Sequence, residues 1–313
     1  MTRIAVTSTP PTVIRGPARH RRVIPGFGLS LGYTTFYLSL VVLIPLAGLM
    51  LETFHLSWHE FWQTITDPLV VASYKLTFGA SLIAAAVNAV FGLIAAWVLL
   101  RYPFPGRKIF DAIIDLPFAL PTAVAGITFS NLYTRDGWIG RIQLGSWIAS
   151  TLNHALPGRP IAPSTLSWLN FDYTNSPAGI VIVLIFIGLP FIVRSVQPVL
   201  QDMDRDVEEA AQSLGATRWY TFRRVIFPNL LPAWLSGLAL AFARAVGEYG
   251  SVIFIAGNIP GKSQIAPLLI VTKLDNYKTA QATAIAVVLL GASLSMLLVI
   301  NGIEWWSRRH ERS

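Results

Sequence analysis

Only a few side chains in this sequence have the types and spacing that chemistry requires. His55 and His59 lie four residues apart, so on a helix both rings would face one side, and Glu52 or Glu60 could supply a third metal ligand. Two tryptophans lie beside the pair, which is typical of a membrane–water interface, so we favour an interfacial segment over a metal site. No other acid, base or metal-binding cluster is visible in the sequence, and the chain has no cysteine.

A second candidate is AGNIPGKS, residues 256–263, which fits a loose phosphate-loop pattern with Ala256 in place of the first glycine. Such a loop must follow a buried strand and open a helix, so that backbone amides surround the phosphates. This segment instead follows a long apolar run. We therefore expect a Gly/Pro turn with an exposed Lys262, and a chain without a catalytic site of its own.

The third candidate is a pair of charges, Arg244 and Glu248, inside the apolar run 230–256. A charge at the centre of a bilayer costs about 2.5 to 3.5 kcal/mol, so both side chains should face protein or water. Two interpretations remain open. The pair forms a structural ion bridge, which we favour, or it lines a route for an oxyanion. Asn88 is a further polar candidate for such a route, although a hydrogen bond between helices is the simpler explanation.

The elements that must position these residues are long apolar helices. The 313 residues are 53% hydrophobic and 13% charged, with a mean hydropathy of +0.55, whereas soluble domains carry about 25% charged residues. A helix of about 20 apolar residues crosses the hydrocarbon core of a bilayer. We predict an all-α polytopic membrane protein of about six transmembrane helices, the third bent or broken by its two prolines. The runs are 23–51, 76–100, 116–134, 173–193, 230–256 and 279–303.

Lysine and arginine predict the orientation of the chain. The segments on one side of these runs hold five, three, five and three basic residues: 1–22, 101–110, 194–228 and 304–313. The excess of basic residues marks the cytoplasmic side, so both termini are expected there. The net charge of +8 therefore reflects topology rather than a nucleic-acid partner. The uncharged part of the first run is too long for a cleaved signal peptide.

These patterns divide the chain into four parts. Residues 1–25 are a basic cytoplasmic tail, residues 26–69 hold the first transmembrane helix and an outer loop, residues 70–305 form the main transmembrane domain, and residues 306–313 are a second tail. The most polar sustained stretch is 202–228. It predicts two short helices joined at Gly215, followed by Pro228 before the fifth run. From the residues alone, it is either a rigid lever or an ordinary interfacial connector.

Within the stretch 202–228, Glu209, Ala210 and Ala211 form a triplet, Gly215 follows after three residues, and Pro228 closes the pattern. This spacing resembles the EAA loop of binding-protein-dependent ABC importer permeases. The resemblance implies a type I ABC importer permease fold in which this loop docks on an ATPase subunit. Glu209 would offer a carboxylate to the partner, the two alanines would permit close approach, and Gly215 would permit the bend.

Three further stretches, DLPFALPTAVAGITFSNLY, GLPFIVRSVQPVLQ and ARAVGEYGSVIFIAGNIPG, look like the T-type permease subunits of bacterial sulfate/thiosulfate importers. This resemblance implies sulfate/thiosulfate import across the bacterial inner membrane. It implies as partners two cytoplasmic ATPase subunits that use ATP and Mg, a second permease of W type, and a periplasmic or lipid-anchored binding protein. This chain itself would bind no cofactor. The outer loop 135–172 is longer than the resemblance leads us to expect.

Two alternatives remain open. Molybdate/tungstate importers share the fold and the EAA loop. An ion-gradient-driven secondary transporter would show paired inverted repeats and broken helices, and no obvious pair is visible in the sequence.

Overall fold

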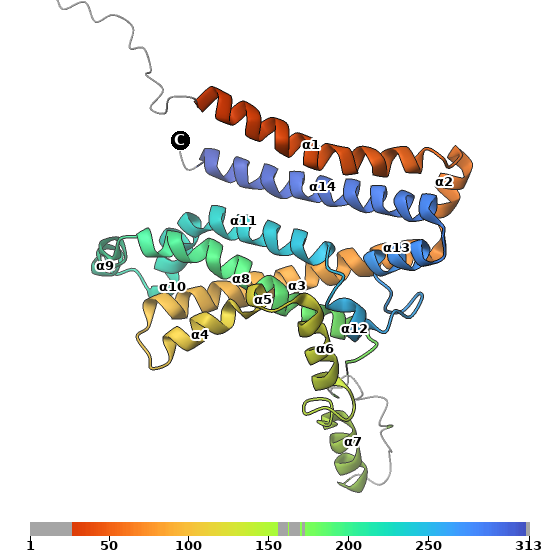
Figure 1. The fold of residues 1–313 in the computed structure, drawn as a ribbon. Coiled ribbons are helices and arrows are strands. Elements are labelled where there is room, and N and C mark those ends of the chain that lie inside the picture. The colour runs from red at the N-terminus through yellow and green to blue at the C-terminus, as the bar shows by residue number, and fades with distance from the viewer. Residues whose placement is uncertain (1–26, 156–161, 163–169, 171–172, 311–313) are drawn as a thin grey trace, which may run out of the picture. The chain divides into compact units, whose positions relative to one another are not determined.

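The computed structural model describes residues 27–155, 162, 170 and 173–310 (Figure 1). The chain divides into two units, residues 1–48 and 49–313, which we describe separately. In its described part, the first unit is formed by most of helix α1, Phe27–Thr53, none of whose side chains is buried. The tail predicted for residues 1–25 lies outside the described residues. The tail predicted for 306–313 begins as helix, because α14 continues to His310.

The second unit consists of helices in its described part, which confirms the predicted all-α class. Among the described residues, five helical segments, α1 included, are long and apolar enough to cross a membrane: 27–53, 68–101, 177–202, 218–246 and 279–302. In chain order the helices of this unit are α2 (Trp58–Ile65), α3 (Pro68–Arg101), α4 (Arg107–Ile114), α5 (Leu116–Ala119), α6 (Thr122–Tyr133), α7 (Leu144–Ala155), α8 (Pro177–Asp202), α9 (Arg205–Ser213), α10 (Arg218–Thr221), the π-helix η2 (Phe222–Ile226), α11 (Phe227–Val246), α12 (Val252–Ala256), α13 (Ala266–Asp275) and α14 (Thr279–His310).

Helices α3, α8 and α11 pack against one another and form the core of the second unit (Figure 1). Small residues permit this closeness, because a Cβ atom at Gly92 of α3 would lie 2.7 Å from the Cβ of Ile192 on α8. A Cβ at Gly188 of α8 would lie 2.4 Å from the amide nitrogen of Asn88 on α3. Small residues allow helices to associate closely in the bilayer. The small residues that α3 buries are Ser73, Thr77, Ala80, Ser81, Ala84, Ala85, Ala89, Gly92 and Ala96.

The third predicted span, 116–134, is not one helix. α5 ends at Ala119, Leu120 and Pro121 have extended backbone, and α6 begins only at Thr122. A proline disfavours the helical conformation of the residue before it, which explains the interruption. The predicted break is therefore confirmed. The unbroken part of this segment, the 12 residues of α6, extends only about 18 Å, so the third segment differs from the long apolar helices in not being one continuous helix.

The fifth predicted span, 230–256, also ends early. α11 stops at Val246, and the chain makes a turn before α12 begins at Val252. The turn packs against α6 at short range, because a Cβ at Gly126 would lie 2.3 Å from the carbonyl oxygen of Ser251. Glycine at such positions allows backbone to approach backbone, which a continuous helix with larger side chains would prevent.

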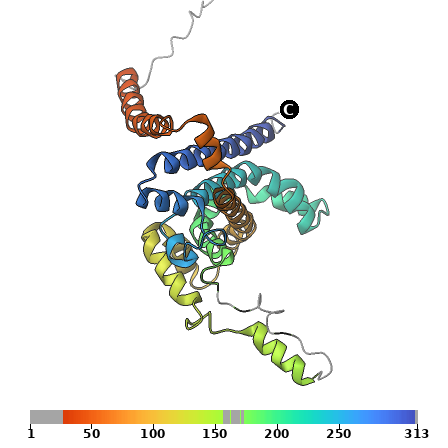
Figure 2. The ribbon, with the colours of Figure 1, turned by 90° about the vertical axis from the view of Figure 1, so that its right-hand side faces the viewer.

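In its described residues, the outer loop 135–172 contains helix α7 and an isolated antiparallel bridge between Gln143 and Asn170. Both views show α7 beyond the end of α6, apart from the α3–α8–α11 core (Figure 2). Residues 156–161, 163–169 and 171–172 of this loop lie outside the described residues.

Candidate functional site

The predicted coupling segment consists of α9 and α10, joined by a turn at Gly215. Gly215 has φ +83°, in the left-handed region, where glycine avoids the steric cost that a Cβ brings. Its N–H donates to the carbonyl of Gln212 at 2.9 Å, and the N–H of Ala216 donates to that of Ala211 at 3.0 Å. These two bonds form a Schellman motif that ends α9. The predicted bend at Gly215 between two helices is therefore confirmed, but only the first of the two helices is short.

The EAA residues lie on the accessible part of this segment. Glu209 and Ala210 are exposed, and Ala211 is half-buried. Beside them is a hollow of about 450 Å³ formed by the end of α9, the turn and the start of α10. Its lining residues are Ala211, Leu214, Gly215, Ala216, Thr217 and Tyr220. A protruding helix with small side chains next to a hollow is suited to contact with a partner surface.

The second helix of the segment continues into the fifth transmembrane helix without a break. α10, η2 and α11 form one helical run from Arg218 to Val246. Within it, the N–H of Phe227 donates to the carbonyl of Phe222, five residues earlier, as in a π-helix. Pro228, which we expected to punctuate this point, lies just after the π-helix inside this run, and local π-helical adjustments are one way in which transmembrane helices accommodate a proline.

Sequence reasoning did not find a partly buried ion pair that joins the coupling segment to α3. Arg101, the last residue of α3, donates to the carboxylate of Glu208 on α9. The guanidinium also lies over the ring of Trp97, 5.5 Å from its centroid. The only signal in the sequence was a charge at the end of an apolar run, and nothing there indicated its partner.

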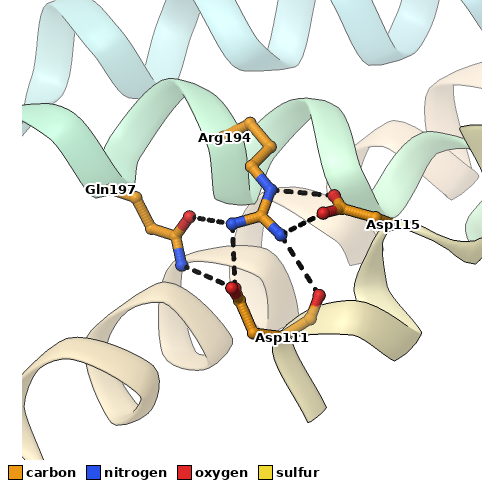
Figure 3. A network of polar contacts seen from close by, with 4 residues as sticks. All are labelled: Asp111, Asp115, Arg194 and Gln197. Atoms are coloured by element: carbon orange, nitrogen blue, oxygen red, sulfur yellow. Dashed lines mark hydrogen bonds and ion pairs between the residues drawn. The ribbon is translucent and has the colours of Figure 1, made fainter. Parts of the chain in front are cut away.

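A second polar network also went unpredicted. Arg194 of α8 donates to Asp111 of α4, to Asp115 before α5, and to Gln197 one turn further along α8 (Figure 3). Arg194 thus connects the broken third segment to α8. The two aspartates precede the prolines of DLPFALP, so the segment had been noted for its break rather than for its charges.

The charges in the fifth segment form the ion bridge that we favoured. Arg244 Nη1 donates to Glu248 Oε2 at 2.5 Å, and the other carboxylate oxygen accepts from the N–H and hydroxyl of Ser251 at 2.9 and 2.8 Å. The side chain of Glu248 is 2% exposed and that of Arg244 is 36% exposed. Glu248 lies in the turn after α11 rather than inside the helix. Whether Arg244 also lines a route stays a prediction.

Asn88 occupies the centre of the core, at the junction of α3 and α8. It is 1% exposed, and neither atom of its amide group has a hydrogen-bond partner among the described residues. The simple expectation of a hydrogen bond between helices is therefore not met by the described residues. A buried polar group without a partner is unfavourable, so a pathway role for Asn88 stays a prediction.

The remaining sequence candidates have other surroundings. Glu60 accepts from both the N–H and the hydroxyl of Ser57, at 2.9 and 2.7 Å, and so caps helix α2. These hydrogen bonds hold the pKa of the Glu60 carboxyl below its ordinary value. Among the described residues, no three His, Asp or Glu side chains gather as a metal site. The segment AGNIPGKS forms a turn after α12, and it follows no strand.

Comparison with known proteins identifies the family to which this chain belongs. Residues 88–309 match the sequence profile of the family described as "Binding-protein-dependent transport system inner membrane component". The chain belongs to this family. The permease resemblance of the EAA loop is thereby confirmed, and the chain is a multi-pass membrane protein and a transport subunit. The breaks in the third and fifth segments, which we had expected of a secondary transporter, occur here in an importer permease.

Individual relatives of this permease are close along nearly the whole chain. It is 44% identical to the sulfate transport system permease protein CysT of Escherichia coli over 91% of this chain and 94% of that protein. It is 47% identical to CysT of Synechocystis over 88% and 89%. Among solved structures, a bacterial ABC transporter that imports the polysaccharide alginate gives a TM-score of 0.67 at 15% identity, covering 90% and 94% of the two chains. The type I permease fold is confirmed.

Proposed function

We propose that this chain is the T-type permease subunit of a sulfate/thiosulfate ABC importer of the bacterial inner membrane. The observation that carries the substrate is the identity of 44% and 47% to two sulfate transport permeases, sustained over about nine-tenths of both chains. The coupling segment supports the mechanism, because its EAA residues are accessible and its turn is rigidly closed.

The chain acts with partners. Two cytoplasmic ATPase subunits bind and hydrolyse ATP with Mg, and the exposed α9 docks on one of them through Glu209 and the small faces of Ala210 and Ala211. A second permease, of W type, completes the route between the two permeases. A periplasmic or lipid-anchored binding protein delivers the anion. This arrangement places both termini of the chain in the cytoplasm, in agreement with the distribution of basic residues.

The route needs hydrogen-bond donors without a tight trap, because a site that binds too strongly slows release. Arg244 meets that need. It carries a permanent positive charge that Glu248 partly offsets, and its side chain is 36% exposed while Glu248 is buried. One guanidinium nitrogen is used in the ion bridge, which leaves further donors for an oxyanion.

The experiment is uptake in a strain that lacks only this chain. Labelled sulfate, thiosulfate and molybdate are supplied separately, with and without a plasmid that restores the gene. We expect loss and restoration of sulfate and thiosulfate uptake, with little change in molybdate uptake. Loss confined to molybdate would favour the alternative, a molybdate/tungstate importer, and would leave the ATP-driven mechanism intact. Unchanged uptake of all three anions would contradict the proposed function.

A further inference from the structure

The ion pair between Arg101 and Glu208 connects two elements that are distant in the sequence. Arg101 ends α3, and Glu208 lies on α9. Their side chains are only 11% and 19% exposed, so the pair is less screened by water than a surface pair. The contact of the guanidinium with Trp97 further fixes its orientation. The pair is therefore an ordered contact.

Packing between α3 and α9 is weak around this pair. A hollow of about 500 Å³ lies between the two helices, with Trp97, Arg101 and Tyr102 on one side and Glu208 and Gln212 on the other. Among the described side chains, no second hydrogen bond or ion pair joins α9 to α3. Movement of α9 cannot pass to α3 through close packing here.

The hollow is roomy and is lined by polar side chains, among them Glu209, Gln212 and Arg218, so it can hold water. Water in a polar hollow adjusts to small displacements, whereas a direct ion pair holds a fixed distance. The Arg101–Glu208 pair is thus the contact between α3 and α9 that can transmit a displacement from one helix to the other.

α3 in turn is closely packed against the core. The contacts of Gly92 with Ile192 and of Gly188 with Asn88 leave no room for a methyl group, so α3 and α8 shift together rather than slide past one another. The coupling segment is already linked covalently to α8 and α11, but α3 lies more than 100 residues earlier in the chain. Trp97 of α3 packs edge-on against Phe222 of η2, with ring centroids 5.7 Å apart, but among the described residues the direct polar link between α3 and α9 themselves is the Arg101–Glu208 pair.

We propose that Arg101 is a positioning residue that transmits the movement of α9 to α3 through Glu208. This inference rests on the proposed function, because α9 must be moved by an ATPase partner. Arg101 lies outside the EAA motif and is thus an additional residue for coupling. The Arg101–Glu208 pair should determine how much sulfate is transported for each ATP hydrolysed. Loss of the Arg101–Glu208 pair should uncouple ATP hydrolysis from sulfate transport rather than abolish hydrolysis.

The test uses the complete importer reconstituted in proteoliposomes, with labelled sulfate uptake and ATP hydrolysis measured on the same preparation. R101Q and E208Q should each lower the ratio of sulfate transported to ATP hydrolysed at least fivefold, while binding-protein-stimulated hydrolysis stays within about twofold. The charge-reversed double variant R101E/E208R should regain most of the ratio. D206N, which removes an exposed charge from the same helix, should leave it unchanged. A normal ratio in R101Q, or a double variant no better than the single ones, overturns the proposal.

A second arm covers the case in which the single variants fail to assemble. The chain has no cysteine, so R101C/E208C can be joined specifically by a short bifunctional thiol reagent. Cross-linking should raise the transport-to-hydrolysis ratio above that of the untreated double variant. No rise on cross-linking contradicts the inference. A wild-type complex that hydrolyses ATP but transports no oxyanion contradicts the proposed function and removes the basis of the inference as well.

Discussion

Arg194 on α8 and Asp115 before α5 form two parallel hydrogen bonds, from Nε to Oδ1 at 2.8 Å and from Nη2 to Oδ2 at 2.5 Å (Figure 3). Only the planar guanidinium group offers this geometry, because its donors form a rigid fork. A third donor atom, Nη1, reaches Asp111 of α4 at 2.8 Å. The broken third segment is thereby attached to a continuous helix by one side chain.

Replacement of Arg194 by lysine should weaken this attachment even though the charge is kept. A lysine cannot form the two parallel bonds, so we expect R194K to lose about 1 kcal/mol of stability and R194Q about 2 kcal/mol, because water partly screens the aspartates. Thermal unfolding of the purified protein in detergent measures the relative stabilities of wild type, R194K and R194Q. R107Q, at an exposed arginine of α4, should melt as the wild type does. Equal melting of R194K and wild type would contradict the role given to the fork.

Gly215 should tolerate asparagine but not valine. Its φ of +83° is costly for a β-branched side chain, about 1 to 2 kcal/mol or more, whereas asparagine visits this region readily. No atom lies within 4 Å of a Cβ placed there, so backbone strain rather than a clash is tested. We expect G215V to lose ATPase copurification and sulfate uptake, and G215N to keep most of both. Wild-type behaviour of G215V would argue against the coupling role of this turn.

The contrast between these two sites shows what a sequence reveals. The turn at Gly215 is local: a helix-forming stretch, a glycine and an aromatic segment lie within 27 residues of one another, so their spacing alone predicts two helices and a bend. The partners of Arg194 and Arg101 lie 79 and 107 residues away in the chain. Such pairs depend on how helices pack, which hydrophobic periodicity does not specify.

The differences between the apolar runs and the observed helices have the same origin. Apolar runs at 116–134 and 230–256 satisfy a length criterion, but the backbone leaves the helix at Leu120 and again after Val246. The prolines of the third segment predicted the break at Leu120. The second break depends on the close contact of Gly250 with Thr122 of α6, where a Cβ would lie 2.4 Å from the hydroxyl oxygen. That contact belongs to the tertiary structure and leaves no local pattern.

The pair Arg244 and Glu248 allows stability and transport to be separated. R244Q leaves a carboxylate of 2% exposure without its cation, and we expect a loss of about 2 kcal/mol, less than for a fully buried pair because water reaches Arg244. The double variant R244Q/E248Q should regain stability, since no unpaired charge remains. If Arg244 lines the route, sulfate uptake by this stable double variant should stay at least tenfold below wild type. Full recovery of uptake would leave the pair a purely structural role.

The cap of helix α2 should respond to acid. The pKa of the Glu60 carboxyl is lowered chiefly by its hydrogen bond with the Ser57 side chain, with a smaller effect from His59. A lowered pKa in the folded state means that the cap stabilises α2 above the ordinary pKa of glutamate, and that this contribution is lost as pH falls through the lowered value. Amide hydrogen-exchange protection in α2 should therefore decrease in acid in the wild type. In E60Q, which cannot titrate at this position, protection should change less; the same pH dependence in both would contradict the cap.

Two glycines on α3 provide a matched test of the core. A Cβ at Gly92 would lie 2.7 and 2.8 Å from the Cβ and Cγ2 of Ile192, whereas nothing lies within 4 Å of a Cβ at Gly79. We expect G92A to lower stability by about 1 to 3 kcal/mol through overpacking. G79A should be neutral or should stabilise the protein by up to about 1 kcal/mol, because alanine has a higher helix propensity than glycine. Thermal unfolding in detergent measures the stability of both variants, and G92A as stable as G79A would show that α3 and α8 are not in such close contact.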